Sequence, residues 1–215
     1  MYAIPTEKDY NEVKEYIDIL VSYGFGNWSD NWNYGQWVDE YKNYLADHYG
    51  FNFYDGCTKA VVTNADSKWV IKVDLDSGWT HRGHTYCELE ALNWIQILEA
   101  GFEKYFAATY FVEMVNGIEF FMQEYAENDE STYDSLCFSY YRSNSEKSEE
   151  EDEYDCYSDY WDMSDEERLY AIYGCQNNTH ELVDFCWSNH INDLHCGNFG
   201  ETKDGRTVIF DYSGY

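Results

Sequence analysis

The sequence contains few basic residues. Only 13 Lys and Arg stand against 42 Asp and Glu in a chain of 215 residues, which gives a formal net charge of -29. A charge of this size repels the phosphates of nucleic acids and the headgroups of acidic membranes. The composition therefore argues against direct binding to either partner.

Long apolar runs are also lacking. No stretch approaches the roughly 20 apolar residues that a membrane-spanning helix needs, and residues 1–8 lack the basic and apolar regions of a signal peptide. We expect a protein of the cytoplasm. The length favours one sizeable domain rather than two.

Paired cysteine motifs are absent. The seven cysteines are an odd number and form no Cys-x-x-Cys pair, which argues against a disulfide framework or a zinc site and favours buried thiols. Aliphatic residues are scarce, but 23 Tyr, 12 Phe and 8 Trp supply large apolar surface for a core. The chain is thus acidic without being disordered throughout.

Residues 1–50 are expected to form two helices. Thr6 and Asp9 have the spacing of a capping box, and apolar residues then recur at helical intervals until Gly24. A connection rich in Gly, Asn and Trp over residues 24–35 leads to a second amphipathic helix, which Gly50 ends. We interpret residues 1–50 as an N-terminal helical extension.

Residues 51–126 show the alternation of strands. Strands are predicted near residues 51–53, 60–63 and 69–73, and two more over 105–113 and 118–125, joined at the hairpin signal Asn116-Gly117. A helix opening at Thr85 and closing at Gly101 lies between the two groups. The pattern predicts an α+β fold with a five-stranded antiparallel sheet.

Residues 127–167 are strongly acidic, with a block of like charge at 149–153. Such blocks are commonly solvated, but the aromatic residues interleaved with them are unusual for a disordered segment. We interpret the segment as an acidic insertion, which either docks a partner or remains a solvated loop. Two helices, capped near Ser164 and Thr179, then lead to His190.

Three oxygen-bearing side chains near the C-terminus form a pattern typical of phosphoryl transfer. Asp193 and Asn198 are five residues apart, and Asp211 follows the apolar run 208–210. One carboxylate can orient an attacking hydroxyl, while an amide oxygen and a second carboxylate hold Mg²⁺. Each residue alone is better explained as a turn or cap residue, but the joint spacing favours a site.

The stretch Asn192-Asp193-Leu194-His195-Cys196-Gly197-Asn198 resembles the catalytic loop of the protein-kinase-like superfamily, in the form of its aminoglycoside phosphotransferase branch. Asp211-Tyr212-Ser213 stands where kinases have Asp-Phe-Gly, and Ile191 replaces the histidine that normally stands two places before the aspartate. Compact protein-kinase-like proteins of bacteriophages are similar in these motifs. If the chain is encoded by a phage, the expected cytoplasm is that of the host cell.

The resemblance implies a phosphotransferase that uses ATP and Mg²⁺, with Asp193 as the catalytic residue and Asn198 and Asp211 as metal ligands. It also implies that Lys72, in Trp69-Val70-Ile71-Lys72, holds the nucleotide phosphates and that Glu90 pairs with Lys72. Glu88 competes with Glu90, but its spacing from Thr85 assigns it to a capping box.

Each of these residues also has an ordinary explanation. Lys72 could be a surface lysine whose stem packs along the sheet, and both glutamates could be solvated helix charges. His190, His195 and Cys196 show no fourth ligand at a recognised spacing for a transition metal.

The nucleotide contacts implied by the resemblance are less specific. Gly56 alone stands where a phosphate-covering glycine loop is expected, and Gln123-Glu124-Tyr125-Ala126 would be the hinge beside the adenine. Gly56, Glu124 and Ala126 are therefore expected to contact the nucleotide. The organisation would be a kinase-like N-lobe at 51–126, the acidic insertion at 127–167 and a truncated, mostly helical C-lobe at 168–215.

A second hypothesis is a pseudokinase, an acidic kinase-fold protein that binds a basic, nucleic-acid-binding host protein by charge mimicry. The net charge, the reduced glycine loop and the truncated C-lobe favour it. The retention of Asp193, Asn198 and Asp211 disfavours it, because a pure decoy needs no metal ligands. The sequence does not indicate the acceptor of an enzyme reaction or the oligomeric state.

Overall fold

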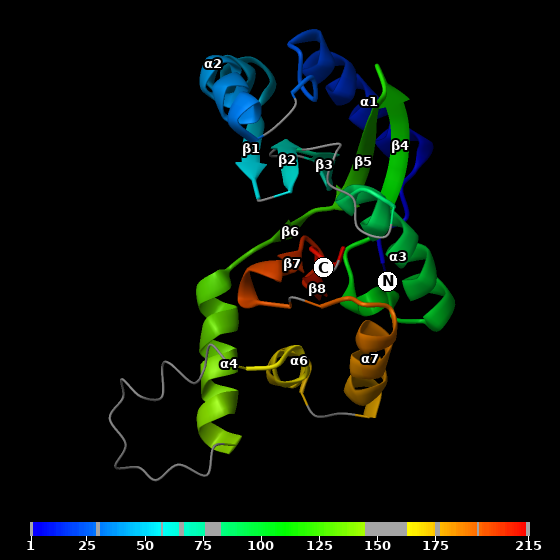
Figure 1. Ribbon diagram of the computed structural model, residues 1–215, viewed down its shortest axis with the longest axis vertical. Coiled ribbons are helices and arrows are strands. Elements are labelled where there is room, and N and C mark those ends of the chain that lie inside the picture. The colour runs from blue at the N-terminus through cyan, green and yellow to red at the C-terminus, as the bar shows by residue number, and fades with distance from the viewer. Residues whose placement is uncertain are drawn as a thin grey trace.

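The computed structural model describes residues 2–28, 31–56, 58–64, 67–75, 83–144, 163–174, 177–192 and 194–213. Within these ranges the protein is α+β, with six α-helices and a five-stranded antiparallel sheet, as the sequence predicts. In Figure 1 the large sheet and helices α1 and α2 form the upper part, and helices α4, α6 and α7 form the lower part. A small sheet, β6 to β8, lies between them.

The large sheet has the strand order β1-β2-β3-β5-β4, and every neighbouring pair is antiparallel. Its strands are β1 (Phe51–Asp55), β2 (Lys59–Asn64), β3 (Trp69–Asp74), β4 (Thr109–Val115) and β5 (Ile118–Glu124). The hairpin between β4 and β5 turns at Asn116 and Gly117, whose φ angles of 53° and 82° are those of a type I′ turn. The predicted hairpin signal is therefore confirmed.

Helix α1 (Glu7–Ser22) begins with the predicted capping box between Thr6 and Asp9. Helix α2 (Asn31–Tyr49) begins earlier than predicted, so Gly35 lies within the helix and not in the preceding connection. The reason is tertiary packing: Tyr34 and Trp37, on either side of the glycine, are buried. Their burial offsets the poor helix propensity of glycine.

Helix α3 (Tyr86–Ala100) runs from the N-cap Thr85 to Gly101, in the left-handed conformation, as predicted. Only half of the predicted capping box forms. The Glu88 amide donates to Thr85 Oγ1 at 3.4 Å, but the Glu88 carboxylate lies 2.9 Å from His84 Nδ1.

The chain between α3 and β4 differs from the prediction. A 3₁₀ turn, η1 (Glu103–Tyr105), replaces the start of the strand predicted from Tyr105, and β4 begins only at Thr109. The intervening Phe106 forms a bridge with Ile209. The pairing of this segment with the C-terminal part of the chain explains the later strand start.

The lower part contains three helices and the small sheet. These elements are β6 (Ala126–Glu127), α4 (Glu130–Asn144), α6 (Asp165–Tyr173), α7 (Asn177–Ser188), the 3₁₀ turn η2 (Cys196–Asn198), β7 (Phe199–Thr202) and β8 (Thr207–Ile209). Ser164 and Glu167 form the capping box predicted for α6. Helix α7 begins two residues before the predicted Thr179.

Helix α4 lies inside the segment predicted as an acidic insertion. Tyr133 and Cys137 on this helix are buried, and the Tyr133 ring packs 5.9 Å from Phe199 in β7. Residues 130–144 therefore belong to the packed body of the protein and are not a solvated loop. The charge block at 149–153 lies outside the described residues.

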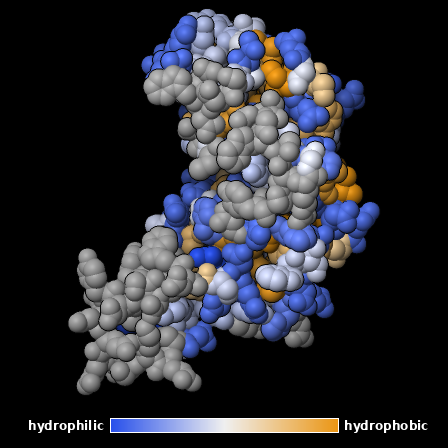
Figure 2. All heavy atoms as spheres, viewed as in Figure 1, coloured by the Kyte–Doolittle hydropathy of each residue, from blue (hydrophilic) through white to orange (hydrophobic). Residues whose placement is uncertain are grey.

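The described cysteines, Cys87, Cys137, Cys186 and Cys196, are buried, as expected for core thiols. In the view of Figure 2, hydrophilic residues cover most of the described surface, and hydrophobic residues show in smaller areas between them. Among the described helices, none combines the length and the apolar character that crossing a bilayer requires.

Candidate functional site

The predicted ion pair between β3 and α3 is present. Lys72 and Glu90 are both buried, with 3% and 0% of their surface exposed, and Lys72 Nζ lies 2.8 Å from Glu90 Oε2. Lys72 also donates a hydrogen bond of 2.9 Å to the carbonyl oxygen of Phe210. The two residues are therefore neither a surface lysine nor a solvated helix charge.

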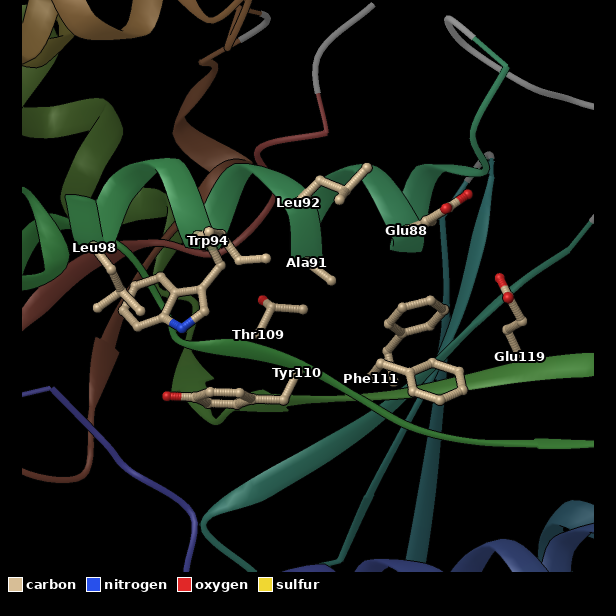
Figure 3. A pocket seen from close by; sticks show the side chains of 11 residues that line it. Glu88, Ala91, Leu92, Trp94, Leu98, Thr109, Tyr110, Phe111 and Glu119 are labelled. Carbon is tan, nitrogen blue, oxygen red and sulfur yellow. The ribbon is translucent and has the colours of Figure 1, made fainter. Parts of the chain in front are cut away.

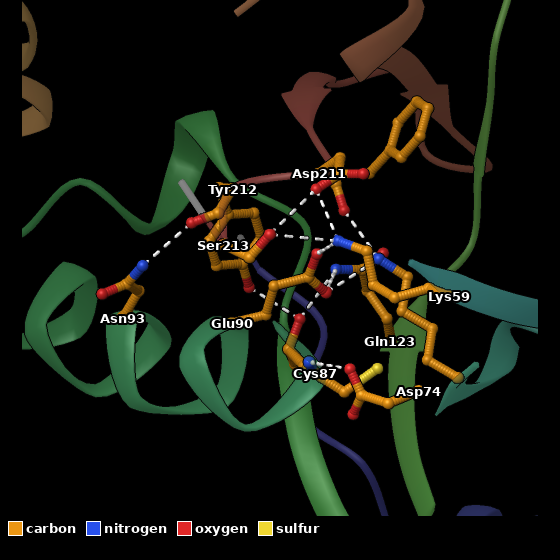
Figure 4. A network of polar contacts seen from close by, with 12 residues as sticks. Lys59, Asp74, Cys87, Glu90, Asn93, Gln123, Asp211, Tyr212 and Ser213 are labelled. Carbon is orange, nitrogen blue, oxygen red and sulfur yellow. Dashed lines mark hydrogen bonds and ion pairs between the residues drawn. The ribbon is translucent and has the colours of Figure 1, made fainter. Parts of the chain in front are cut away.

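A second lysine, which the sequence reasoning missed, shares the same glutamate. Lys59, the first residue of β2, lies 2.6 Å from Glu90 Oε1, 2.6 Å from Asp211 Oδ1 and 3.2 Å from Ser213 Oγ (Figure 4). These three acceptors match the three protons of an ammonium group.

A sequence signal for Lys59 exists but is weak. Lys59 and Val61 share one face of β2, and Val61 pairs with Lys72 across the strands. Both lysines therefore face the same side of the sheet. This becomes visible only once the register is known, because a one-residue shift would turn every side chain of β2 to the other face.

Both oxygens of the buried Glu90 carboxylate accept hydrogen bonds, and two ammonium groups balance its charge. Its Oε1 accepts from Lys59, and its Oε2 accepts from Lys72 and from Gln123 Nε2, at 3.3 Å. Gln123 is itself fixed by a 2.8 Å bond to Thr109 Oγ1. A buried charge is tolerated only when it is paired and hydrogen-bonded in this way.

Tyr212 anchors the segment that carries Asp211. Its hydroxyl is buried, donates to the Ala107 carbonyl at 2.7 Å and lies 2.6 Å from Thr109 Oγ1. Asn93 of α3 donates to the Tyr212 carbonyl at 2.8 Å. The segment is thus tied both to α3 and to the start of β4, which holds Asp211 against Lys59 (Figure 4).

The small sheet sets Asn198 beside this segment. Phe199 in β7 pairs with Ile209 in β8, and the Phe210 amide donates to the Asn198 carbonyl at 3.0 Å. The antiparallel register therefore leaves Asn198 and Asp211 at neighbouring ends of the two strands. The Asp211 side chain is 37% exposed, and Asn198 is buried.

Charge pairing determines the ionisation of Lys59 and Asp211. Burial acts to lower the pKa of the Lys59 ammonium, but the carboxylates of Asp211 and Glu90 outweigh it and raise that pKa above its ordinary value. Burial acts to raise the pKa of Asp211, but the charges of Lys59 and Lys72 lower it below its ordinary value. Both groups are therefore charged at neutral pH.

These residues line one cleft of about 680 Å³ between the large and the small sheet. Lys59, Lys72, Asn198 and Asp211 contribute to its wall, as do Gly56 and the connection 123–128. The volume lies within the usual range of about 300–1,000 Å³ for pockets that bind small molecules and cofactors. Of the predicted site residues, Lys72, Glu90, Asn198 and Asp211 thus gather in one place.

The residues predicted to contact the nucleotide already have partners within the protein. The Gly56 amide already donates to the Lys59 carbonyl at 3.0 Å, so this amide is engaged in the turn between β1 and β2 and does not point at a ligand. Glu124 donates its amide to the Ala108 carbonyl, and its carboxylate binds Arg206. Ala126 pairs with Thr202 in the small sheet.

Asp193 lies outside the described residues, but the chain on both sides of it is held. Ile191 and Leu194 are buried, and the Leu194 amide donates to Asp165 Oδ1 at 2.9 Å. His195 Nδ1 accepts a 3.1 Å bond from the Gly197 amide, and this bond orients the loop. His190, two residues after the end of α7, is in the left-handed conformation, with φ 57°.

The donors in the cleft fit Mg²⁺ bound together with phosphates. No group of three or more His, Cys, Asp and Glu suitable for a metal occurs among the described residues. Asn198 and Asp211 offer only hard oxygen atoms and a single carboxylate. Mg²⁺ is commonly held by one or two carboxylates, with water and substrate phosphates completing its shell.

A separate cavity of about 430 Å³ lies between α3 and strands β4 and β5 (Figure 3). Its wall is mainly apolar, with Leu92, Trp94, Tyr110 and Phe111 among the contributors. None of the predicted site residues lines it.

In comparisons with known proteins, no family model and no curated protein matches this chain. The function is therefore inferred from the residues of the cleft.

Proposed function

We propose that the protein has a kinase-like fold and transfers a phosphoryl group from ATP, with Mg²⁺, to an acceptor hydroxyl. The observation that carries the proposal is the buried pair of Lys72 and Glu90, whose lysine lines one cleft with the oxygen donors Asn198 and Asp211. Phosphoryl transfer depends on positioning and on compensating phosphate charge, and this set of groups supplies both.

Each residue has a distinct task in the proposed reaction. Glu90 orients the Lys72 ammonium toward the nucleotide phosphates, and the carboxylate of Asp193 orients the acceptor hydroxyl and accepts its proton. Asn198 and Asp211 would hold Mg²⁺, which supplies charge neutralisation at the phosphate oxygens. The Tyr212 anchor keeps Asp211 at the inner end of the cleft.

The overall charge opposes a polyanionic substrate, but local charges decide its binding. At ordinary ionic strength, exposed charges farther than about 10 Å are largely screened. Within the cleft, the buried ammonium groups of Lys59 and Lys72 are close enough to act. The net charge of -29 therefore lowers the rate of approach more than it lowers the affinity.

Nucleotide binding is tested by thermal melting with ATP and Mg²⁺. At a free ATP concentration about 100 times Kd, the midpoint of unfolding should rise by roughly 5–10 °C. Lys72→Met should lose most of this rise, whereas Lys42→Met, at an exposed position on α2, should keep it. A wild-type midpoint that does not respond to ATP and Mg²⁺ contradicts the proposal.

Transfer itself is tested with ATP labelled at the γ-phosphate, incubated with the protein and a cell extract. Asp193→Asn removes the group that accepts the hydroxyl proton, so label transfer should fall by at least about 100-fold. Equal labelling by wild type and Asp193→Asn would show that a contaminating kinase or another residue is responsible.

One observation favours the pseudokinase alternative. The two ammonium groups and the two carboxylates neutralise one another without any ligand, and the Gly56 amide is engaged. In that case ATP would leave the melting midpoint unchanged, and a purified basic nucleic-acid-binding protein would bind in a salt-sensitive manner. Binding that survives about 1 M salt would contradict charge mimicry.

A further inference from the structure

Lys59 lies between the two carboxylates of the cleft. All three of its protons are engaged, by Glu90, Asp211 and Ser213, and its side chain is only 6% exposed. Lys72, by contrast, is held by Glu90 and by the carbonyl oxygen of Phe210. Lys59 is thus the ammonium group that directly contacts the predicted metal ligand Asp211.

The charges of the cluster show what Lys59 adds. With Lys59 and Lys72 facing Glu90 and Asp211, the four groups sum to zero; with Lys72 alone they would sum to -1. A negative cluster inside a negative protein would repel phosphate. A neutral one accepts a nucleotide whose charge is partly balanced by Mg²⁺.

The contact between Lys59 and Asp211 conflicts with metal binding. A divalent cation on the Asp211 carboxylate would lie beside the Lys59 ammonium, and two cations at that distance repel each other strongly in a site of low dielectric constant. Lys59 therefore has to leave Asp211 when metal binds. Its flexible side chain allows this movement, and the residue already lines the cleft.

The Gly56 amide, in the turn before Lys59, is not available as a hydrogen-bond donor to a phosphate. The Gly56 amide is engaged by the Lys59 carbonyl, so the backbone there does not present this donor to a ligand. The phosphate oxygens of a nucleotide are then the natural new acceptors for the released ammonium.

We propose that Lys59 is an exchangeable counter-ion: it binds Asp211 while the cleft holds no nucleotide, and it moves to the phosphates when nucleotide and metal enter together. This inference rests on the proposed function. It makes metal and nucleotide binding cooperative, because each ligand takes over one partner of the Lys59–Asp211 pair. Metal alone binds weakly.

The test uses Mn²⁺ as the probe for metal and a non-hydrolysable ATP analogue as the probe for nucleotide, both measured by calorimetric titration. Lys59→Met should bind Mn²⁺ alone more tightly than wild type, because Asp211 is released. The same variant should bind the analogue with Mn²⁺ about 10- to 100-fold more weakly, the range of a lost charged hydrogen bond. Lys42→Met should change neither affinity.

Opposite signs for the two ligands distinguish exchange from a structural role. If Lys59→Met weakens both ligands, or changes neither, Lys59 does not exchange and the inference is overturned. If Lys59→Met does not fold, the test is made on the wild-type protein. Its affinity for Mn²⁺ should be at least about tenfold higher with the analogue than without it. Equal Mn²⁺ affinities in the two conditions overturn the inference.

The proposed function can fail separately. If wild type binds no analogue, the phosphotransferase proposal fails, while the Mn²⁺ titration of Lys59→Met without nucleotide still measures whether Lys59 occupies Asp211. If the Mn²⁺ affinity in that titration equals that of wild type, Lys59 does not act as an exchangeable counter-ion of Asp211, whatever the outcome with the analogue.

Discussion

Lys59 Nζ and Asp211 Oδ1 lie 2.6 Å apart although 152 residues separate them in the chain. The contact joins the first residue of β2 to the segment after β8, across the inner end of the cleft. Because Glu90 of α3 binds the same ammonium, three elements from distant parts of the chain meet at one point. The predictions below concern this meeting point and the contacts that position it.

Glu90→Gln should strongly destabilise the protein. The substitution leaves two buried ammonium groups without their shared carboxylate, and removing one partner of a buried ion pair typically costs about 3–5 kcal/mol. Urea denaturation measures the loss. The matched control is Glu99→Gln at an exposed position of the same helix, which should change the free energy of unfolding by less than about 0.5 kcal/mol.

The contribution of Asp211 to stability should depend on pH only at acid values. Its pKa in the folded state is lowered from the ordinary 3.8, so its stabilising effect is fully present above that value and is lost as pH falls through the lower folded pKa. The difference in unfolding free energy between wild type and Asp211→Asn should therefore stay constant from about pH 7 to 5 and shrink below about pH 4.

Urea denaturation of both proteins across this pH range checks the prediction. Asp39→Asn, whose side chain is 83% exposed, controls for the loss of one negative charge. A difference that stays constant from about pH 5 down to about pH 2 would mean that the pKa of Asp211 is not lowered.

Two glycine substitutions should have opposite effects. A Cβ atom at Gly200 would lie 2.9 Å from the Glu127 carbonyl oxygen, so Gly200→Ala forces β7 away from β6 and should cost about 1–3 kcal/mol. Gly35 is exposed within α2, and a Cβ atom there would meet nothing within 4 Å apart from its chain neighbours and the helix's own backbone, so Gly35→Ala should stabilise by about 0.5–1 kcal/mol. Thermal unfolding of both variants measures the two signs. A neutral Gly200→Ala would show that the two strands separate easily.

Tyr212→Phe should loosen the segment that carries Asp211. Loss of the hydroxyl removes the bonds to the Ala107 carbonyl and to Thr109 Oγ1, at a cost of about 1–3 kcal/mol. A double-mutant cycle with Thr109→Val should give a coupling energy of about 0.5–3 kcal/mol. Strict additivity of the two variants would contradict a direct bond between these side chains.

Local features of the fold could be predicted where short-range geometry decides them. The capping boxes at Thr6 and Ser164 and the turn at Asn116-Gly117 are present as expected, since a side chain that bonds a nearby amide needs no distant partner. Element bounds were less predictable. Helix α2 extends through Gly35 because residues around it are buried by the rest of the protein.

Composition was a poor guide to packing in α4. The acidic character of residues 127–167 indicated an insertion, but burial depends on one face of a helix and not on average charge. Tyr133 and Cys137 are four residues apart on that face and pack against the C-terminal part of the chain.

By itself, the sequence determined which chemistry was available: a lysine in an apolar strand, a glutamate in the following helix, and amide and carboxylate oxygens at the end of the chain. The pairing of Lys72 with Glu90 could be anticipated because the resemblance to kinases implied it. Only the tertiary structure brought Lys59 between Glu90 and Asp211. Strand register and the fold-back of the C-terminal segment decide that contact, and a lysine at the start of a strand looks the same in sequence whether it meets solvent or two buried carboxylates.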